Sequence, residues 1–140
     1  MKRLLLLLSS VFLIVSIMAI PVLASSSWHF TMNHDGRYID GAENGQFHSL
    51  SKGKVTISGS IWATVIKSEK VGPKSITFEL RNKKTGNKFG TVTVKPNKNY
   101  SSKAFSKVFP KKVGGGKKYY LLVYRGSADG RTIKGSGKLK

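Results

Sequence analysis

The sequence contains no cysteine and only six acidic residues in 140. Without cysteine the chain has no disulfide and no thiolate metal site, and thiol catalysis is excluded. The fold must therefore be stabilised by packing. The six carboxylates are set against 25 lysine and arginine residues, which gives a formal net charge of +19 at pH 7. Repulsion among so many like charges lowers the stability of the folded chain. An anionic partner would offset this repulsion, so the excess favours such a partner.

A long apolar run occurs at the N-terminus, where LLLLLSSVFLIVSIMAI follows Met1-Lys2-Arg3. The next residues are PVLA, which place Val22 and Ala24 at the −3 and −1 positions of a small-residue cleavage site. This pattern predicts a secretory signal peptide over residues 1–24. We therefore expect the protein to be secreted, and extracellular or associated with the cell wall. An uncleaved anchor is the alternative, since the run is at the short end of what spans a bilayer.

Residues 25–140 are long enough for one domain with its own core, and nothing in their pattern divides them. Loss of Lys2 and Arg3 with the signal peptide lowers the formal charge to about +17, well above the magnitude of roughly 2 to 8 that solubility requires. In this part lysine outnumbers arginine 19 to 4. Because lysine is a hydrated point charge and arginine a planar fork, the composition favours a diffuse polyanion as partner.

The spacing of apolar residues predicts strands. In KVTISGSIWATVIK, Val55, Ile57, Ile61 and Val65 share one face, with Gly59 expected at a bulge or bend. The stretch SITFELRNKKTGNKFGTVTVK predicts a hairpin that turns at residues 85–87. YSSKAFSKVF fits either a helix or a strand, and strand is favoured. KKYYLLVYR is typical of a buried strand.

The final segment, TIKGSGKLK, alternates again, with Ile133 and Leu139 directed inward. About eight short strands with turn signals every 8 to 12 residues predict an all-β protein. We expect a single antiparallel β-sandwich, either Ig-like or jelly-roll-like.

The segment SSWHFTMNHDGRYIDGAENGQFH contains two turn signals, Asp35-Gly36 and Asn44-Gly45. They predict a meander of three strands in which Met32, Ile39 and Leu50 line up on one face.

The same segment holds all three histidines, His29, His34 and His48. In the meander His29 points away from His34, and His48 lies roughly 13 Å from His34. Metal ligands must converge within about 2 Å of the ion, so we expect solvated or rim histidines and no metal site. A longer loop that bends His48 back is the alternative.

Asp35, Asp40 and Glu43 are the candidate acid–base residues of this segment. Paired-carboxylate catalysis needs two such groups about 5 to 10 Å apart, one with a raised pKa. Aspartate in a turn is explained by its bond to nearby backbone. No G-x-S-x-G elbow occurs, and GGGKK lacks the order of a phosphate-binding loop. We therefore expect no enzymatic activity and no cofactor.

The basic residues concentrate in the turns and along the last strand, with a further cluster at Lys95 and Lys98. Some of these lysines discourage association of sheet edges. That role does not account for so large a net charge. The predicted polyanion-binding residues are Lys83, Lys84, Lys88, Lys111, Lys112, Lys117, Lys118, Lys134 and Lys138. Three aromatic residues are expected on or near the outer face beside them, Trp62, Phe89 and Phe109, with burial of Trp62 left open.

Three functions fit these features. The first is a secreted, non-enzymatic binding protein whose lysine-rich surface holds an anionic cell-wall polymer, an acidic polysaccharide or anionic lipid headgroups. The second is a cationic antibacterial or toxin-like protein, which needs a membrane-inserting element. The third is binding of extracellular nucleic acid, which secretion makes the weaker reading. An enzyme acting on an anionic substrate ranks below all three.

Overall fold

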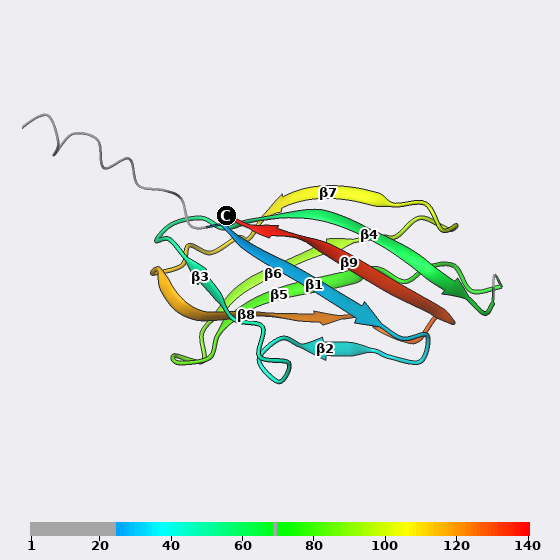
Figure 1. Ribbon diagram of the computed structural model, residues 1–140, viewed down its shortest axis with the longest axis horizontal. Coiled ribbons are helices and arrows are strands. Elements are labelled where there is room, and N and C mark those ends of the chain that lie inside the picture. The colour runs from blue at the N-terminus through cyan, green and yellow to red at the C-terminus, as the bar shows by residue number, and fades with distance from the viewer. Residues whose placement is uncertain (1–24, 69) are drawn as a thin grey trace, which may run out of the picture.

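The computed structural model describes residues 25–68 and 70–140, which form nine strands and no helix. All strands pair antiparallel, in two sheets that face each other (Figure 1). The predicted antiparallel β-sandwich is confirmed. The predicted signal peptide, residues 1–24, lies outside the described residues. Within the described residues, no helix has the length and apolar character needed to cross a membrane.

One sheet has four strands in the order β1-β9-β4-β7. Their bounds are Ser26–Met32 (β1), Arg131–Leu139 (β9), Thr56–Ile66 (β4) and Lys103–Val108 (β7). The other sheet has the order β2-β8-β5-β6, and β3 also pairs with β8. Their bounds are Tyr38–Asp40 (β2), Gly116–Tyr124 (β8), Ile76–Asn82 (β5), Lys88–Val94 (β6) and His48–Leu50 (β3). The ambiguous segment before Pro110 is thus a strand, and the β5–β6 hairpin is confirmed.

The core lies between the sheets and is built on aromatic rings. Trp28 and Phe30 of β1 contact Phe78 of β5, with ring centroids 5.3 and 5.8 Å apart. Phe105 of β7 lies 5.5 Å from Phe78 and 5.9 Å from Trp28. These rings come from strands of both sheets, so their packing joins the two layers.

Gly59 is not at a bulge. It pairs directly with Gly137 in an unbroken part of the β4–β9 ladder. A Cβ atom on Gly59 would collide with the carbonyl oxygen of Ser136 and would lie 2.8 Å from Cζ2 of Trp28, so glycine is required for the close approach of β9 and of the indole. The bulge occurs further along, between Ala63 and Val65. It turns Val65 outward, where 42% of the residue is exposed, although alternation predicts it inside.

The predicted meander is wrong. β1 pairs with β9 in one sheet, whereas β2 and β3 both pair with β8 in the other. The chain at Asp35-Gly36 therefore crosses between the layers and makes no hairpin. Met32 and Leu50 are buried and Ile39 is half-buried, as the apolar pattern requires, but they reach the core from opposite sides. Two facing sheets satisfy that pattern as well as one sheet does.

Arg125 holds this crossing in place. Its guanidinium donates hydrogen bonds to the carbonyl oxygens of Asn33, His34 and Gly36, at 2.8, 3.0 and 2.8 Å. The same group forms a buried ion pair with Asp129. Because the charge is paired and hydrogen-bonded on several sides, its burial is compensated. The carbonyl groups of the crossing segment receive partners that a hairpin would have supplied.

Candidate anion-binding surface

The turn between β5 and β6 is held by Asn82. Its side-chain oxygen accepts hydrogen bonds from the backbone N–H groups of Lys84 and Thr85, at 2.9 and 3.1 Å. Gly86 adopts a φ of 72°, which glycine tolerates without steric cost. Lys83, Lys84 and Lys88 are all exposed around this turn. The local sequence therefore fixes a tight turn that directs its lysines into solvent.

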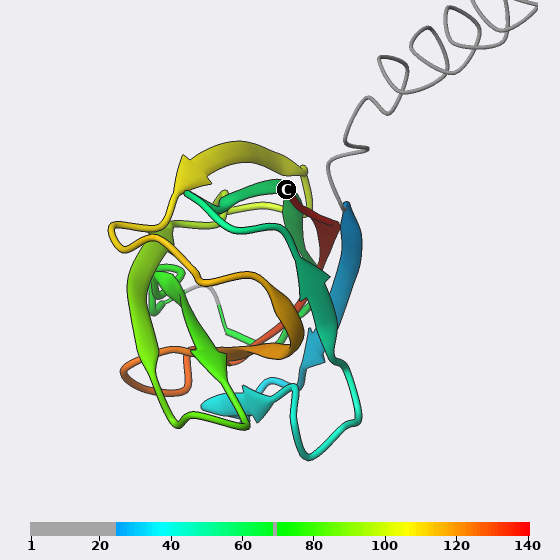
Figure 2. The same ribbon diagram turned by 90° about the vertical axis from the view of Figure 1, so that its left-hand side faces the viewer.

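The connection between β7 and β8 lies against the same turn. The N–H of Lys83 donates to the carbonyl oxygen of Lys118 at 2.9 Å, and the N–H of Lys111 donates to that of Phe89 at 3.2 Å. Val113 forms an isolated bridge with Gly53, which ties the loop to the chain before β4. Figure 2 views the molecule from this end. Backbone hydrogen bonds thus tie the β5–β6 turn to β8 and the β7–β8 connection to β6, which brings their lysines to one end of the molecule.

We call this surface the basic end. Its seven lysines are all exposed, and they flank two shallow hollows of about 360 and 450 Å³. Lys84 and Lys117 line the first hollow, and Lys88, Lys111 and Lys112 line the second. The members of the basic end are Lys83, Lys84, Lys88, Lys111, Lys112, Lys117 and Lys118.

The two remaining predicted lysines, Lys134 and Lys138, lie elsewhere. Both are exposed on β9, a central strand of the four-stranded sheet, and Lys134 is opposite Trp62 of β4. Trp62 is half-buried. Phe89 is also half-buried and packs on Tyr119, whereas Phe109 is fully buried in the core, so its predicted place on the outer face is wrong. The buried Phe109 anchors the chain just before the basic loop.

The acidic residues do not neutralise the lysines. Among residues 25–68 and 70–140, the ion pairs join Arg81 to Glu79 and Arg125 to Asp129, and His34 lies beside Asp35. None involves a lysine. Lys118 instead lies over the ring of Phe47, 4.9 Å from its centroid. The positive charge of the basic end is therefore available to an external anion.

The three histidines do not converge on a common point. His29 is exposed, and its Nε2 lies 3.5 Å from the side-chain nitrogen of Gln46. His34 Nε2 lies 2.9 Å from the carboxylate of Asp35. His48 is buried and bonds the hydroxyl of Ser26 at 2.8 Å, which corrects the expected solvated or rim position. No set of three potential metal-ligating side chains gathers within the described part of the chain.

Burial lowers the pKa of His48 below its usual 6.5.

Of the candidate acid–base residues, Asp40 accepts a hydrogen bond from the N–H of Ala42 at 2.8 Å. This is the local side-chain-to-backbone bond that explains aspartate in turns.

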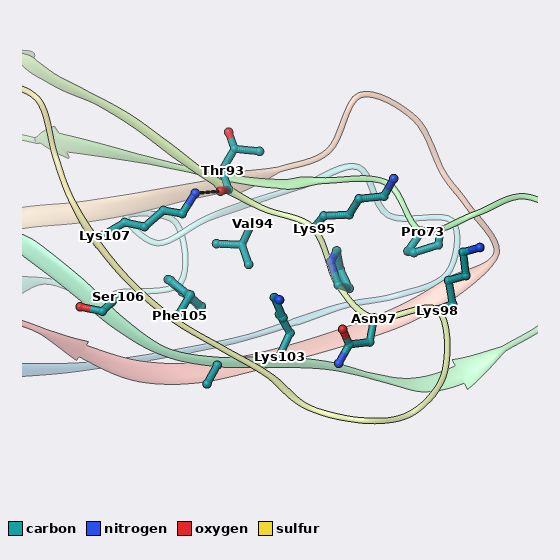
Figure 3. A pocket seen from close by; sticks show the side chains of 12 residues that line it. Pro73, Thr93, Val94, Lys95, Asn97, Lys98, Lys103, Phe105, Ser106 and Lys107 are labelled. Carbon is teal, nitrogen blue, oxygen red and sulfur yellow. Dashed lines mark hydrogen bonds between the residues drawn. The ribbon is translucent and has the colours of Figure 1, made fainter.

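A second group of lysines was not assigned from the sequence. Lys95, Lys98, Lys103 and Lys107 line a groove between β6 and β7 (Figure 3). Lys95 and Lys98 were visible as a cluster in the sequence. Lys103 and Lys107 were not, because the period-two spacing that places them beside Phe105 is meaningful only once residues 103–108 are known to be a strand.

Neither a family model nor a curated protein matches the sequence. Among solved structures, a carbohydrate-binding module of a Cellvibrio mixtus lichenase, solved with cellotriose, has a TM-score of 0.49 at 11% identity. The match covers 85% of this chain and 90% of that one. A mitogen from Yersinia pseudotuberculosis has a TM-score of 0.39 at 11% identity, with 84% and 86% covered. These similarities are too remote to bear on function.

Proposed function

We propose that this protein is a secreted, non-enzymatic binding protein whose lysine-rich surface associates with an anionic polymer of the cell envelope or the extracellular matrix. The basic end is the observation that carries the proposal. There, two loops and the starts of β6 and β8 gather seven exposed lysines that have no carboxylate partner among the described residues. Repulsion among so many like charges costs free energy, and a bound anionic polymer would offset that cost.

The chemistry of the basic end suits a polymer better than a small ligand. Its cations are lysines, which act as hydrated point charges and impose little geometry on the bound group. Its hollows are open and lie between solvent-exposed lysines. A chain with repeated negative charges contacts several such groups at once and releases its counterions. Wall phosphate polymers, acidic polysaccharides and clustered anionic lipid headgroups all have this character.

The place of action follows from the N-terminal sequence. Residues 1–24 have the positive start, apolar run and small-residue cleavage site of a secretory signal. A protein exported by that route meets envelope and matrix polymers before other polyanions. Nucleic acid is a possible partner only where it is released outside cells.

The test uses the full chain and poly(glycerol phosphate) as the probe, with affinity measured by calorimetry over a range of salt concentrations. We expect binding that weakens as salt rises. In the variant Lys111→Gln with Lys112→Gln, the slope of log affinity against log salt should fall by roughly 0.7 for each lost contact. The matched control, Lys134→Gln with Lys138→Gln, removes the same charge from the outer face of the sheet and should leave the slope nearly unchanged.

Two results would count against the proposal. If the wild-type chain fails to bind the polymer at low salt, the function is wrong. If the slope of log affinity against log salt falls equally in both double variants, binding depends on the total charge of the protein. The basic end is then not the contact surface.

A further inference from the structure

The groove between β6 and β7 lies at an open side of the sandwich. β6 is an edge strand of one sheet and β7 an edge strand of the other, so no strand among the described residues closes the gap between them. The groove has a volume of about 570 Å³. This is within the range of roughly 300 to 1,000 Å³ that is typical of ligand sites. Its volume is larger than that of either hollow at the basic end, which measure about 360 and 450 Å³.

Its walls carry four lysines and no acidic residue. Lys107 donates a hydrogen bond to the carbonyl oxygen of Thr93 at 2.7 Å, which links the two strands at one end of the groove. The side-chain ammonium groups of Lys95, Lys98 and Lys103 have no hydrogen-bond or ion-pair partner within residues 25–68 and 70–140. Figure 3 shows Lys103 directed into the space between the strands. The groove therefore presents three cations that lack a counter-charge.

The floor between these cations is apolar. Val94 and Pro96 line it from the β6 side, and half-buried Phe105 lines it from β7. The ring of Phe105 is fixed by its contacts with Trp28 and Phe78, so the floor is rigid. A ligand that fits needs an apolar face and negative charges around it. A sugar acid has both, because its ring presents C–H groups and its rim carries a carboxylate. A plain phosphate chain has only the charge.

The connection from β6 to β7 is held in shape before any ligand arrives. The side-chain nitrogen of Asn97 donates to the carbonyl oxygens of Ser101 and Ser102, at 3.3 and 3.1 Å. The side-chain oxygen of Asn99 accepts from the N–H of Ser101 at 3.1 Å. This loop carries Lys98 and leads into Lys103. Because its conformation is already fixed, binding loses less conformational entropy there.

We propose that this groove binds a segment of an acidic oligosaccharide, with its sugar rings against the Phe105 floor and its carboxylates bound by Lys95, Lys98 and Lys103. The inference rests on the proposed function and names the class of polymer. It also places a second binding site outside the basic end. The basic end then supplies general attraction to a polyanion, and the groove selects for sugar acids.

The experiment measures binding of a short oligogalacturonate to the full chain at near-physiological salt. Cello-oligosaccharide of the same length is the neutral probe, and short polyphosphate is the probe without sugar. We expect oligogalacturonate to bind more tightly than either. The variant Lys95→Gln, Lys98→Gln and Lys103→Gln should weaken this binding about tenfold or more. The matched variant Lys83→Gln, Lys84→Gln and Lys88→Gln removes the same charge from the basic end and should change it less than threefold.

The outcomes separate this inference from the proposed function. Equal weakening by both triple variants, or tighter binding of polyphosphate than of oligogalacturonate, would overturn the groove as a sugar-acid site. Binding of poly(glycerol phosphate) by the basic end would be untouched by either result. Thermal unfolding of both variants serves as the check on folding, and all six substituted lysines are exposed.

Discussion

Gly137 and Gly59 set the distance between the β4–β9 ladder and the indole of Trp28. A Cβ atom on Gly137 would collide with the backbone carbonyl oxygen of Ser58 and would lie 2.7 Å from Cζ2 of Trp28. Neither neighbour can yield cheaply, because one is backbone and the other is a ring packed against Phe30 and Phe78.

The substitution Gly137→Ala should therefore lower the free energy of unfolding by about 1 to 3 kcal/mol, the usual cost of overpacking. Urea denaturation measures the change. Gly126→Ala is the control, since a Cβ atom there meets no atom within 4 Å, and it should stay within about 0.5 kcal/mol of wild type. Equal stability of the two variants would contradict the close packing of Ser58 and Trp28 around Gly137.

His48 gives the fold a pH dependence. Because burial lowers the pKa of the folded imidazole, the unfolded chain takes up a proton at a higher pH than the folded chain does. The contribution is fully present above about pH 6.5 and is lost as the pH falls toward the folded pKa.

The loss of stability between pH 7.5 and pH 5 should accordingly be smaller in His48→Gln than in wild type. Glutamine keeps a polar group near Ser26 without titrating. Urea unfolding at the two pH values is the measurement. His29→Gln, at an exposed site, should retain the wild-type dependence, and a loss of the dependence there would refute the assignment to His48.

Among the elements, those fixed by local pattern were predicted well. Apolar alternation identifies β5, and Gly86 marks its hairpin with β6, because both signals lie within a few residues. The crossing after β1 could not be found in this way. Asp35-Gly36 has the same signal whether it closes a hairpin or joins two sheets. The deciding contacts come from Arg125, about 90 residues later in the chain.

The candidate sites show the same contrast between what a local sequence pattern predicts and what depends on contacts between distant segments. The sequence identified the lysines of the basic end, but their proximity depends on hydrogen bonds between segments far apart in the chain, such as Lys83 to Lys118 of β8. It included Lys134 and Lys138 in one set with them, although the fold places these two on the outer face of β9. The groove was missed because it exists only between two edge strands of different sheets.

The β6–β7 connection allows a test at the scale of one element. Asn97→Ala removes the hydrogen bonds to Ser101 and Ser102 and leaves the groove lysines in place. Affinity for oligogalacturonate should fall several-fold, because the loop must then be ordered on binding. Calorimetry measures this effect. Asn44→Ala, at an exposed turn on another loop, is the control. Unchanged affinity in Asn97→Ala would show that the loop contributes nothing to the groove.

At the scale of the whole molecule, charge is distributed unevenly. The arginines of β5 and β8–β9 pair with Glu79 and Asp129, while the lysines remain unpaired among the described residues. Glu79 and Asp129 thus pair with arginine, and no lysine among the described residues forms an ion pair with a carboxylate. Uncompensated positive charge of this size lowers stability, so an anionic polymer that binds the folded chain should raise its melting temperature.

The most direct test of the account is co-sedimentation of the full chain with cell-wall material at near-physiological salt, before and after the anionic polymers of the wall are removed. We expect the protein to sediment with intact material and to stay in solution once those polymers are gone. Equal sedimentation with intact and stripped material would contradict it, because the lysine-rich surface would then not be what holds the protein to the wall.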